Sequence, residues 1–103
     1  MQAKSPLYDH ILEQLKNTVL QFFEDENVTI FLFGSSARGD HHRYSDIDIG
    51  ILSNNGYNKK KLILLREKLE NMNNPYSVDL VDISKVSDDF RENILKEGKI
   101  WKS

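Results

Sequence analysis

The chain has 103 residues, which is the size of one domain and too short for two independent hydrophobic cores. With 39% hydrophobic and 29% charged residues, its composition is that of a folded protein and excludes a disordered tail. The net charge of -2 does not indicate nucleic acid or an anionic membrane as a partner, and the absence of cysteine excludes disulfides, thiolate zinc sites and cysteine nucleophiles. From the length we expect one domain over residues 1–103. Because no signal pattern or long apolar run is present, we expect the protein in the cytoplasm.

The first half of the chain predicts a helix followed by two strands. Ser5 and Pro6 are typical of a helix start, and apolar residues then recur at helical spacing as far as Phe22. Residues 28–33 form a short β-branched and aromatic run that stops at Gly34, which predicts a buried strand. After a polar stretch, residues 45–52 place an apolar side chain at every second position, which predicts a strand with one apolar face.

The second half predicts a helix, a strand and a last helix. Residues 59–72 carry apolar side chains on one helical stripe, and residues 77–83 are strand-like. Ser87 is typical of a helix start, and Gly98 of a helix end. The apolar side chains expected in the core from this half are Leu62, Leu65, Leu69, Met72, Phe90, Ile94, Leu95, Ile100 and Trp101.

Two acidic residues of the second predicted strand are candidate metal ligands. Asp46 and Asp48 are two residues apart, so both carboxylates leave the strand on one face, with Cα atoms about 7 Å apart. Two ionised carboxylates this close repel each other unless a cation or strong donors lie between them. Mg²⁺ prefers oxygen ligands and is commonly shared between carboxylates and substrate phosphates. The pair therefore predicts a Mg²⁺ site that a nucleotide completes.

The third predicted strand offers one further carboxylate. Asp79 and Asp82 are three residues apart and lie on opposite faces, so only one of them can join the pair. If Val78 and Leu80 share the core with the isoleucines of the second strand, Asp79 lies on the side of the pair and Asp82 at the frayed strand end. Three carboxylates on adjacent strands can hold two Mg²⁺ ions about 4 Å apart, which suits in-line displacement at phosphorus.

A segment of small residues follows the first predicted strand. It reads Gly34, Ser35, Ser36, Ala37, Arg38 and Gly39. Small residues let the backbone approach a ligand closely, and a short helix beginning at Ser35 or Ser36 would direct free N–H groups at phosphate oxygens. Arg38 supplies a planar cation that matches phosphate. We therefore expect this segment to bind the phosphates of the nucleotide.

Together these two parts resemble a known family. Gly34 and Ser35, then ten residues, then Asp46, Ile47 and Asp48 are similar to the Gly-Ser, spacer, Asp-x-Asp signature of the DNA polymerase beta-type nucleotidyltransferases. Within that superfamily the chain most resembles the minimal nucleotidyltransferases, over nearly its whole length. The resemblance implies an α/β (α+β) nucleotidyltransferase fold, a three-stranded mixed sheet with helices packed on one face, in the order α-β-(short α)-β-α-β-α.

The resemblance also implies roles for individual residues. The nucleotide-binding residues would be Gly34, Ser35, Ser36, Arg38 and Ser45. The metal ligands and catalytic residues would be Asp46, Asp48 and Asp79, with Asp79 as the base. The implied cofactor is Mg²⁺, as two ions, and the implied substrate is ATP or another nucleoside triphosphate.

Minimal nucleotidyltransferases are commonly encoded with a helical HEPN-type partner. The resemblance therefore implies an antitoxin that transfers AMP from ATP to a hydroxyl, such as a tyrosine, of a HEPN-type toxin within a hetero-oligomer. The sequence leaves two alternatives open: a non-catalytic module that neutralises a partner by contact, and a subunit that modifies a small, aminoglycoside-like acceptor. Direct binding of nucleic acid or of a membrane is not expected from the overall charge.

Overall fold

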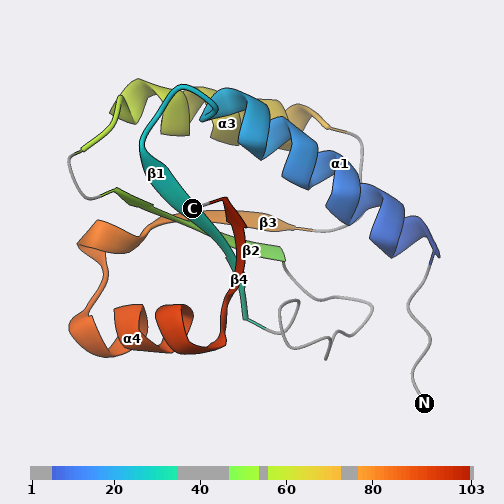
Figure 1. Cartoon of the computed structure of the whole chain (residues 1–103). Helices are drawn as coiled ribbons and strands as arrows, with labels where there is room; N and C mark the ends of the chain where they lie inside the picture. Colours follow the sequence, from blue (N-terminus) through green and yellow to red (C-terminus); the bar gives the residue numbers. More distant parts are fainter. Residues whose placement is uncertain (1–5, 35–46, 54–55, 73–76, 103) are drawn as a thin grey trace, which may run out of the picture.

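The computed structural model describes residues 6–34, 47–53, 56–72 and 77–102, which build one mixed sheet with helices on both sides (Figure 1). The elements in chain order are α1 (Pro6–Phe22), β1 (Val28–Phe33), β2 (Ile47–Ser53), α3 (Lys59–Asn71), β3 (Val78–Asp82), the short 3₁₀ turn η1 (Ile83–Lys85), α4 (Asp88–Glu97) and β4 (Lys99–Lys102). The α/β (α+β) class and the mixed sheet that the sequence predicts are therefore confirmed. The predicted short helix at Ser35 or Ser36 lies outside the described residues.

The sheet has four strands in the order β3-β2-β1-β4, one more than predicted. β1 is antiparallel to both β2 and β4, whereas β2 and β3 are parallel and are joined through α3, as a parallel pair requires. The additional strand forms because the chain turns sharply at Gly98, whose N–H donates to the Ile94 carbonyl at 2.8 Å. A Cβ at Gly98 would lie 2.6 Å from that carbonyl oxygen and 3.3 Å from the Leu32 carbonyl oxygen. The absent side chain therefore lets residues 99–102 pair directly with β1.

The larger core lies on the sheet face that packs against α1 and α3. Alternate residues of β1 and β2 point to this face, together with Leu80 of β3 and the inward stripe of each helix. The buried side chains of this core are Tyr8, Ile11, Leu15, Val19, Phe23, Val28, Ile30, Leu32, Ile47, Ile49, Ile51, Leu65, Leu69 and Leu80. The predicted helical stripes and the predicted apolar face of β2 are thus confirmed.

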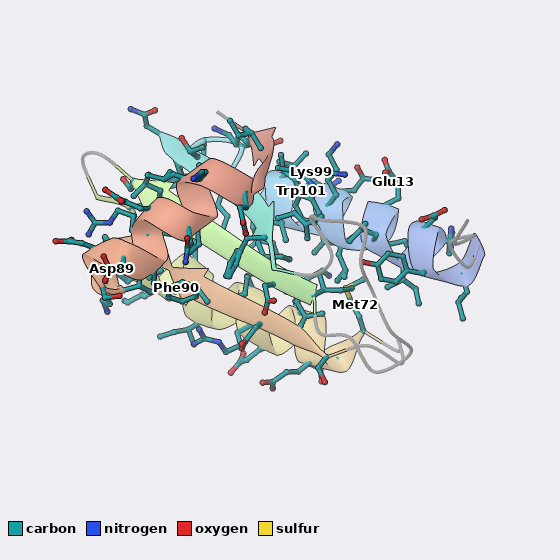
Figure 2. The ribbon with its side chains drawn as sticks, turned by 90° about the horizontal axis from the view of Figure 1, so that it is seen from below. Glu13, Met72, Asp89, Phe90, Lys99 and Trp101 are labelled. Atoms are coloured by element: carbon teal, nitrogen blue, oxygen red, sulfur yellow. The ribbon has the colours of Figure 1, made fainter. Side chains whose placement is uncertain are left out.

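The opposite face is also covered, which corrects the expectation that helices pack on one face. Phe31 and Phe33 of β1 point away from α1 and are buried together with Ile83 of η1 and Ile94 of α4. Figure 2, seen from this side, shows α4 crossing in front of the sheet. The four successive apolar residues at the end of β1, residues 30–33, require this cover, because an unbroken apolar run is typical of a strand buried on both faces.

The inward face of α4 differs from the prediction. Ile94 is buried as expected, but Leu95 is 46% exposed and Phe90 is 41% exposed. Ile100 in β4 is 60% exposed, whereas Trp101 packs against the larger core. A helix of ten residues that covers only part of the sheet buries one narrow stripe, so its flanking apolar side chains remain in contact with solvent. None of the helices in the described part of the chain has the length and apolar character needed to cross a membrane.

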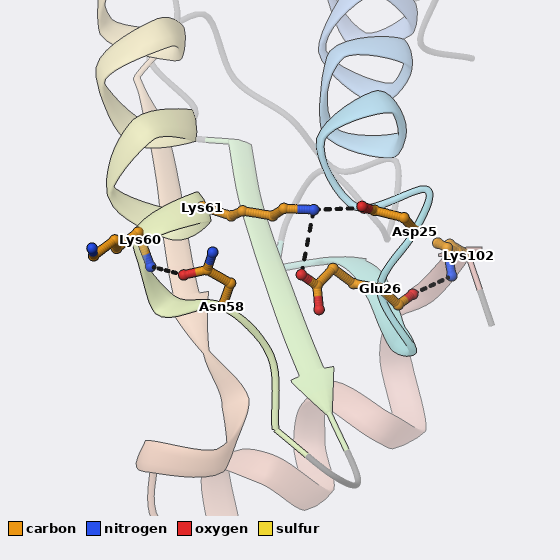
Figure 3. A network of polar contacts seen from close by, with 6 residues as sticks. All are labelled: Asp25, Glu26, Asn58, Lys60, Lys61 and Lys102. Atoms are coloured by element: carbon orange, nitrogen blue, oxygen red, sulfur yellow. Dashed lines mark hydrogen bonds and ion pairs between the residues drawn. The ribbon is translucent and has the colours of Figure 1, made fainter.

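A network of polar contacts joins the start of α3 to the turn between α1 and β1 (Figure 3). Lys61 of α3 forms ion pairs with Asp25 and with Glu26, the latter at 3.3 Å. Lys102 of β4 donates to the Glu26 carbonyl at 3.1 Å, and Asn58 caps α3 by accepting from the Lys60 N–H at 3.0 Å. The network therefore connects three segments that are far apart in the sequence.

Candidate functional site

The register of the sheet brings two of the predicted carboxylates together. Asp48 of β2 lies opposite Asp79 of the parallel strand β3 and opposite Phe33 of the antiparallel strand β1. Residues at facing positions of neighbouring strands leave the sheet on the same side. Asp48 and Asp79 therefore share the face that α4 covers in part, and Asp79 is exposed to solvent.

Gly34 lies directly beside the Asp48 carboxylate. It follows β1 with a φ of 76°, a left-handed conformation that strongly favours glycine. A Cβ at this position would overlap Oδ2 of Asp48, so the Asp48 carboxylate occupies the space that any other residue would fill. The predicted phosphate-binding segment therefore begins in contact with a predicted metal ligand.

Apolar side chains pack beside the carboxylates on the same face of the sheet. Gly50, two residues after Asp48, has no side chain, and a Cβ there would lie 2.7 Å from Cδ1 of Ile83 and 3.3 Å from Phe33. Ile83 therefore packs directly on β2 and fixes the turn that follows β3. This role of Gly50 was not predicted from the sequence, although a glycine inside a strand is a recognised sign of close approach by another group.

Asp82 is buried and hydrogen-bonded, whereas the sequence predicted that it lies at a frayed strand end. It is 8% exposed, its Oδ2 accepts from Nζ of Lys59, and its Oδ1 accepts from Oγ of Ser84 at 2.6 Å and from the Ser84 N–H at 3.1 Å. Burial alone would raise the pKa of Asp82, but the hydrogen bonds from Lys59 and Ser84 outweigh it and hold the pKa below its ordinary value. Asp82 therefore has a structural role that joins β3, η1 and the start of α3.

The described residues contain two of the three carboxylates expected to hold metal. Asp48 and Asp79 provide oxygen ligands on one face, and Gly34 beside the Asp48 carboxylate lets a phosphate approach closely. This donor set fits Mg²⁺. Within the described ranges no three acidic or histidine side chains gather as a metal site. The other predicted site residues lie outside the described residues: Ser35, Ser36, Arg38, Ser45 and Asp46.

Comparison with known proteins gives matches over most of the chain. Residues 13–103 match the family model described as polymerase beta, nucleotidyltransferase. The "Probable protein adenylyltransferase MntA" of Haemophilus influenzae is 37% identical over 68 residues, which are 66% of this chain and 60% of that protein. The protein adenylyltransferase MntA of Shewanella oneidensis is 36% identical over 73 residues, which are 70% of this chain and 52% of that protein. The matches thus span between half and two thirds of the curated relatives.

Solved structures share the fold. A crystal structure of a toxin-antitoxin with AMP-PNP superposes with a TM-score of 0.67 at 30% identity, covering 85% of this chain and 73% of that one. A structure of a tri-AMPylated Shewanella oneidensis HEPN toxin in complex with MNT antitoxin gives a TM-score of 0.61 at 24% identity, covering 88% and 71%. At that identity, the second likeness shows the fold alone. Because the family model covers nearly the whole chain, including the strands that carry Asp48 and Asp79, the chain belongs to the polymerase beta nucleotidyltransferase family.

Proposed function

We propose that this chain is an adenylyltransferase, which moves AMP from ATP to a hydroxyl group on a protein acceptor. The observation that carries the proposal is the placement of Asp48 and Asp79 at facing positions of parallel strands, with Gly34 against the Asp48 carboxylate. This arrangement joins carboxylate ligands to a backbone segment that a phosphate can approach. The adenylyltransferases of Haemophilus and Shewanella, and the complex with AMP-PNP, support ATP as the donor.

The proposed reaction is an in-line displacement at the α-phosphorus. The acceptor oxygen forms a new bond to phosphorus, the bond to pyrophosphate breaks, and the hydroxyl proton passes to the Asp79 carboxylate. Asp79 suits this role because it is exposed at the edge strand β3, where an acceptor can reach it. Gly34 and Ser35 would hold the triphosphate, and Ser36, Arg38 and Ser45 complete the proposed nucleotide-binding set.

Asp46, Asp48 and Asp79 would hold Mg²⁺, as two ions, in this proposal. When bound, Mg²⁺ would neutralise phosphate charge and favour attack by the acceptor oxygen. The protein holds Asp48 on a well-packed strand, because Ile47 and Ile49, which flank it, are fully buried on the opposite face. The backbone that carries Asp48 is therefore fixed by the larger core before any ligand binds.

The proposed acceptor is a HEPN-type protein, and the chain would act as the antitoxin of a toxin-antitoxin pair. The toxin-antitoxin structure that shares 30% identity with this chain supports a toxin as the partner. The exposure of Asp79 on the edge strand β3 also supports a macromolecular acceptor, because a large molecule can reach the carboxylate there.

The test is to incubate the full chain with ATP labelled at the α-phosphate, Mg²⁺ and a HEPN-type protein from the same genome. We expect label on the HEPN-type protein with the wild type and with Asp89→Asn, a control carboxylate exposed on α4 (Figure 2). Asp48→Asn and Asp79→Asn should leave the acceptor unlabelled. Equal labelling by all four proteins, or none by the wild type, would refute the proposed chemistry. If Asp48→Asn still protected cells from the toxin, contact alone would be the function.

A further inference from the structure

A small pocket lies next to the candidate site, between the end of β1 and α4. It is lined by Phe33, Gly34, Phe90, Asn93, Ile94 and Glu97, and its volume is about 150 Å³. Gly34 is thus shared between this pocket and the Asp48 carboxylate. Across the sheet, the order on this face is Asp79, then Asp48, then the pocket. The pocket therefore lies on the side of Asp48 away from the proposed acceptor position.

The residues that line the pocket are unusual for the inward stripe of a short helix. Phe90, Asn93, Ile94 and Glu97 follow the spacing of one helical face, and on a helix that only packs against a sheet this face is apolar. Here two of the four side chains are polar, whereas the apolar Leu95 points to solvent. Apolar walls with a few convergent polar groups are typical of a ligand site.

The walls of the pocket are held in place by the fold. The Phe90 ring packs edge-on against Phe33, with ring centroids 5.8 Å apart. Ser87 caps α4 by accepting from the Phe90 N–H at 3.2 Å, and the close packing of Gly98 fixes the other end of the helix against β1. Contacts within the chain therefore shape the pocket.

Size and charge restrict what the pocket can hold. Its volume is well below the roughly 300–1,000 Å³ of a site for a drug-sized ligand, so it fits one ring system of a larger molecule. The Glu97 carboxylate among the lining residues disfavours a phosphate inside the pocket itself. The Asn93 carboxamide offers a donor and an acceptor side by side, which is complementary to the amino group and ring nitrogen of adenine.

We propose that the pocket between β1 and α4 binds the adenine ring of the nucleoside triphosphate, with Phe90 as the aromatic contact and Asn93 as the residue that selects adenine. Glu97, as an acceptor, favours an amino group over the carbonyl oxygen that guanine presents at the same place. This inference rests on the proposed function, because it assumes that the phosphates lie over Gly34 and Asp48.

The test compares binding of ATP, GTP and inorganic tripolyphosphate to the full chain with Mg²⁺ by calorimetry. We expect the wild type to bind ATP about tenfold more tightly than GTP. Asn93→Ala and Phe90→Ala should each weaken ATP binding about tenfold and leave tripolyphosphate binding unchanged. The matched control is Glu92→Ala, the exposed neighbour on α4 that does not line the pocket, and it should bind all three ligands as the wild type does.

The outcomes separate this inference from the proposed function. If Asn93→Ala and Phe90→Ala bind ATP as the wild type does while Asp48→Asn abolishes transfer, the function stands and the assignment of the pocket is wrong. Equal weakening of ATP and tripolyphosphate would also overturn it, because the effect would then concern the phosphates. A wild type that binds tripolyphosphate and ATP equally overturns it as well. Should Phe90→Ala lose its cooperative thermal unfolding, Asn93→Ala carries the test, since Asn93 is exposed.

Discussion

The sheet face that packs against α1 and α3 is apolar along the two central strands, β1 and β2, whereas the face toward α4 carries Asp48, Asp79 and a smaller apolar cluster. The same strands build both faces, because successive side chains alternate between them. Ile47 and Ile49 are fully buried on one side, and Asp48 between them points to the other. One face therefore provides most of the stability, and the other holds groups that are placed for chemistry.

The largest expected effect on stability comes from the face toward α1. Ile49→Ala removes a fully buried side chain next to Asp48 and should lower the free energy of unfolding by about 2–5 kcal/mol. Chemical denaturation of the variant and the wild type measures this loss. Because the carboxylate face is unchanged, the folded fraction of the variant should still bind nucleotide. A variant with full stability would show that this face is not the main source of stability.

Gly34→Ala tests the boundary between the two faces. The added Cβ requires a left-handed backbone that costs about 1–2 kcal/mol for a residue with a side chain, and it displaces the Asp48 carboxylate. We expect a moderate loss of thermal stability together with a loss of Mg²⁺-dependent ATP binding. Gly56→Ala is the matched control, since Gly56 also has a positive φ of 86° but has no atom within 4 Å of the added Cβ. Equal effects of the two changes on ATP binding would contradict the contact proposed for Gly34.

Asp82→Asn tests whether the second acidic residue of β3 is structural. Losing the charged partner of Lys59 in a buried position should cost about 1–3 kcal/mol. The pKa of Asp82 is lowered in the folded state, so unfolding takes up a proton in acid. The stabilisation by Asp82 is therefore present above the ordinary carboxyl pKa of about 4 and is lost as the pH falls toward the lower folded pKa. Unfolding of the wild type between pH 2 and 6 should show this dependence, and the variant should show less of it. Identical profiles would refute the assignment.

Lys61→Met should have the smallest effect. The ion pairs of Lys61 with Asp25 and Glu26 join the start of α3 to the α1–β1 turn, but Asp25 is largely exposed. Exposed pairs contribute little and are screened by salt. The variant should therefore melt slightly below the wild type at low salt, and the difference should vanish at about 1 M salt. A large loss of stability that salt does not change would show that the network in Figure 3 is part of the core.

Local patterns in the sequence predicted much of the fold. Residues 28–33 were expected to form a strand and do so, and Ser87 and Gly98 were expected to bound the last helix, as they do. The alternation of β2 and β3 also placed Asp48 and Asp79 on one side, in agreement with the register. These features depend on neighbours in the sequence, which is why periodicity reveals them.

The features that sequence analysis missed depend on contacts between distant segments. Asp82 pairs with Lys59, which lies 23 positions earlier, and neither residue alone indicates the other. β4 has only four residues, too few for a reliable period, and it forms through pairing with β1. The cover on the second face of the sheet could have been predicted, because residues 30–33 of β1 are all apolar and such a run indicates burial on both faces.

The central claim is that Asp48 and Asp79 together hold a divalent ion beside the nucleotide. Mn²⁺ can replace Mg²⁺ as a spectroscopic probe, and electron paramagnetic resonance measures how much of it stays free in the presence of ATP and protein. We predict that the wild type and Asp89→Asn take up Mn²⁺ when ATP is present, and that Asp48→Asn and Asp79→Asn each leave most of it free. Equal uptake by all four proteins would contradict the account.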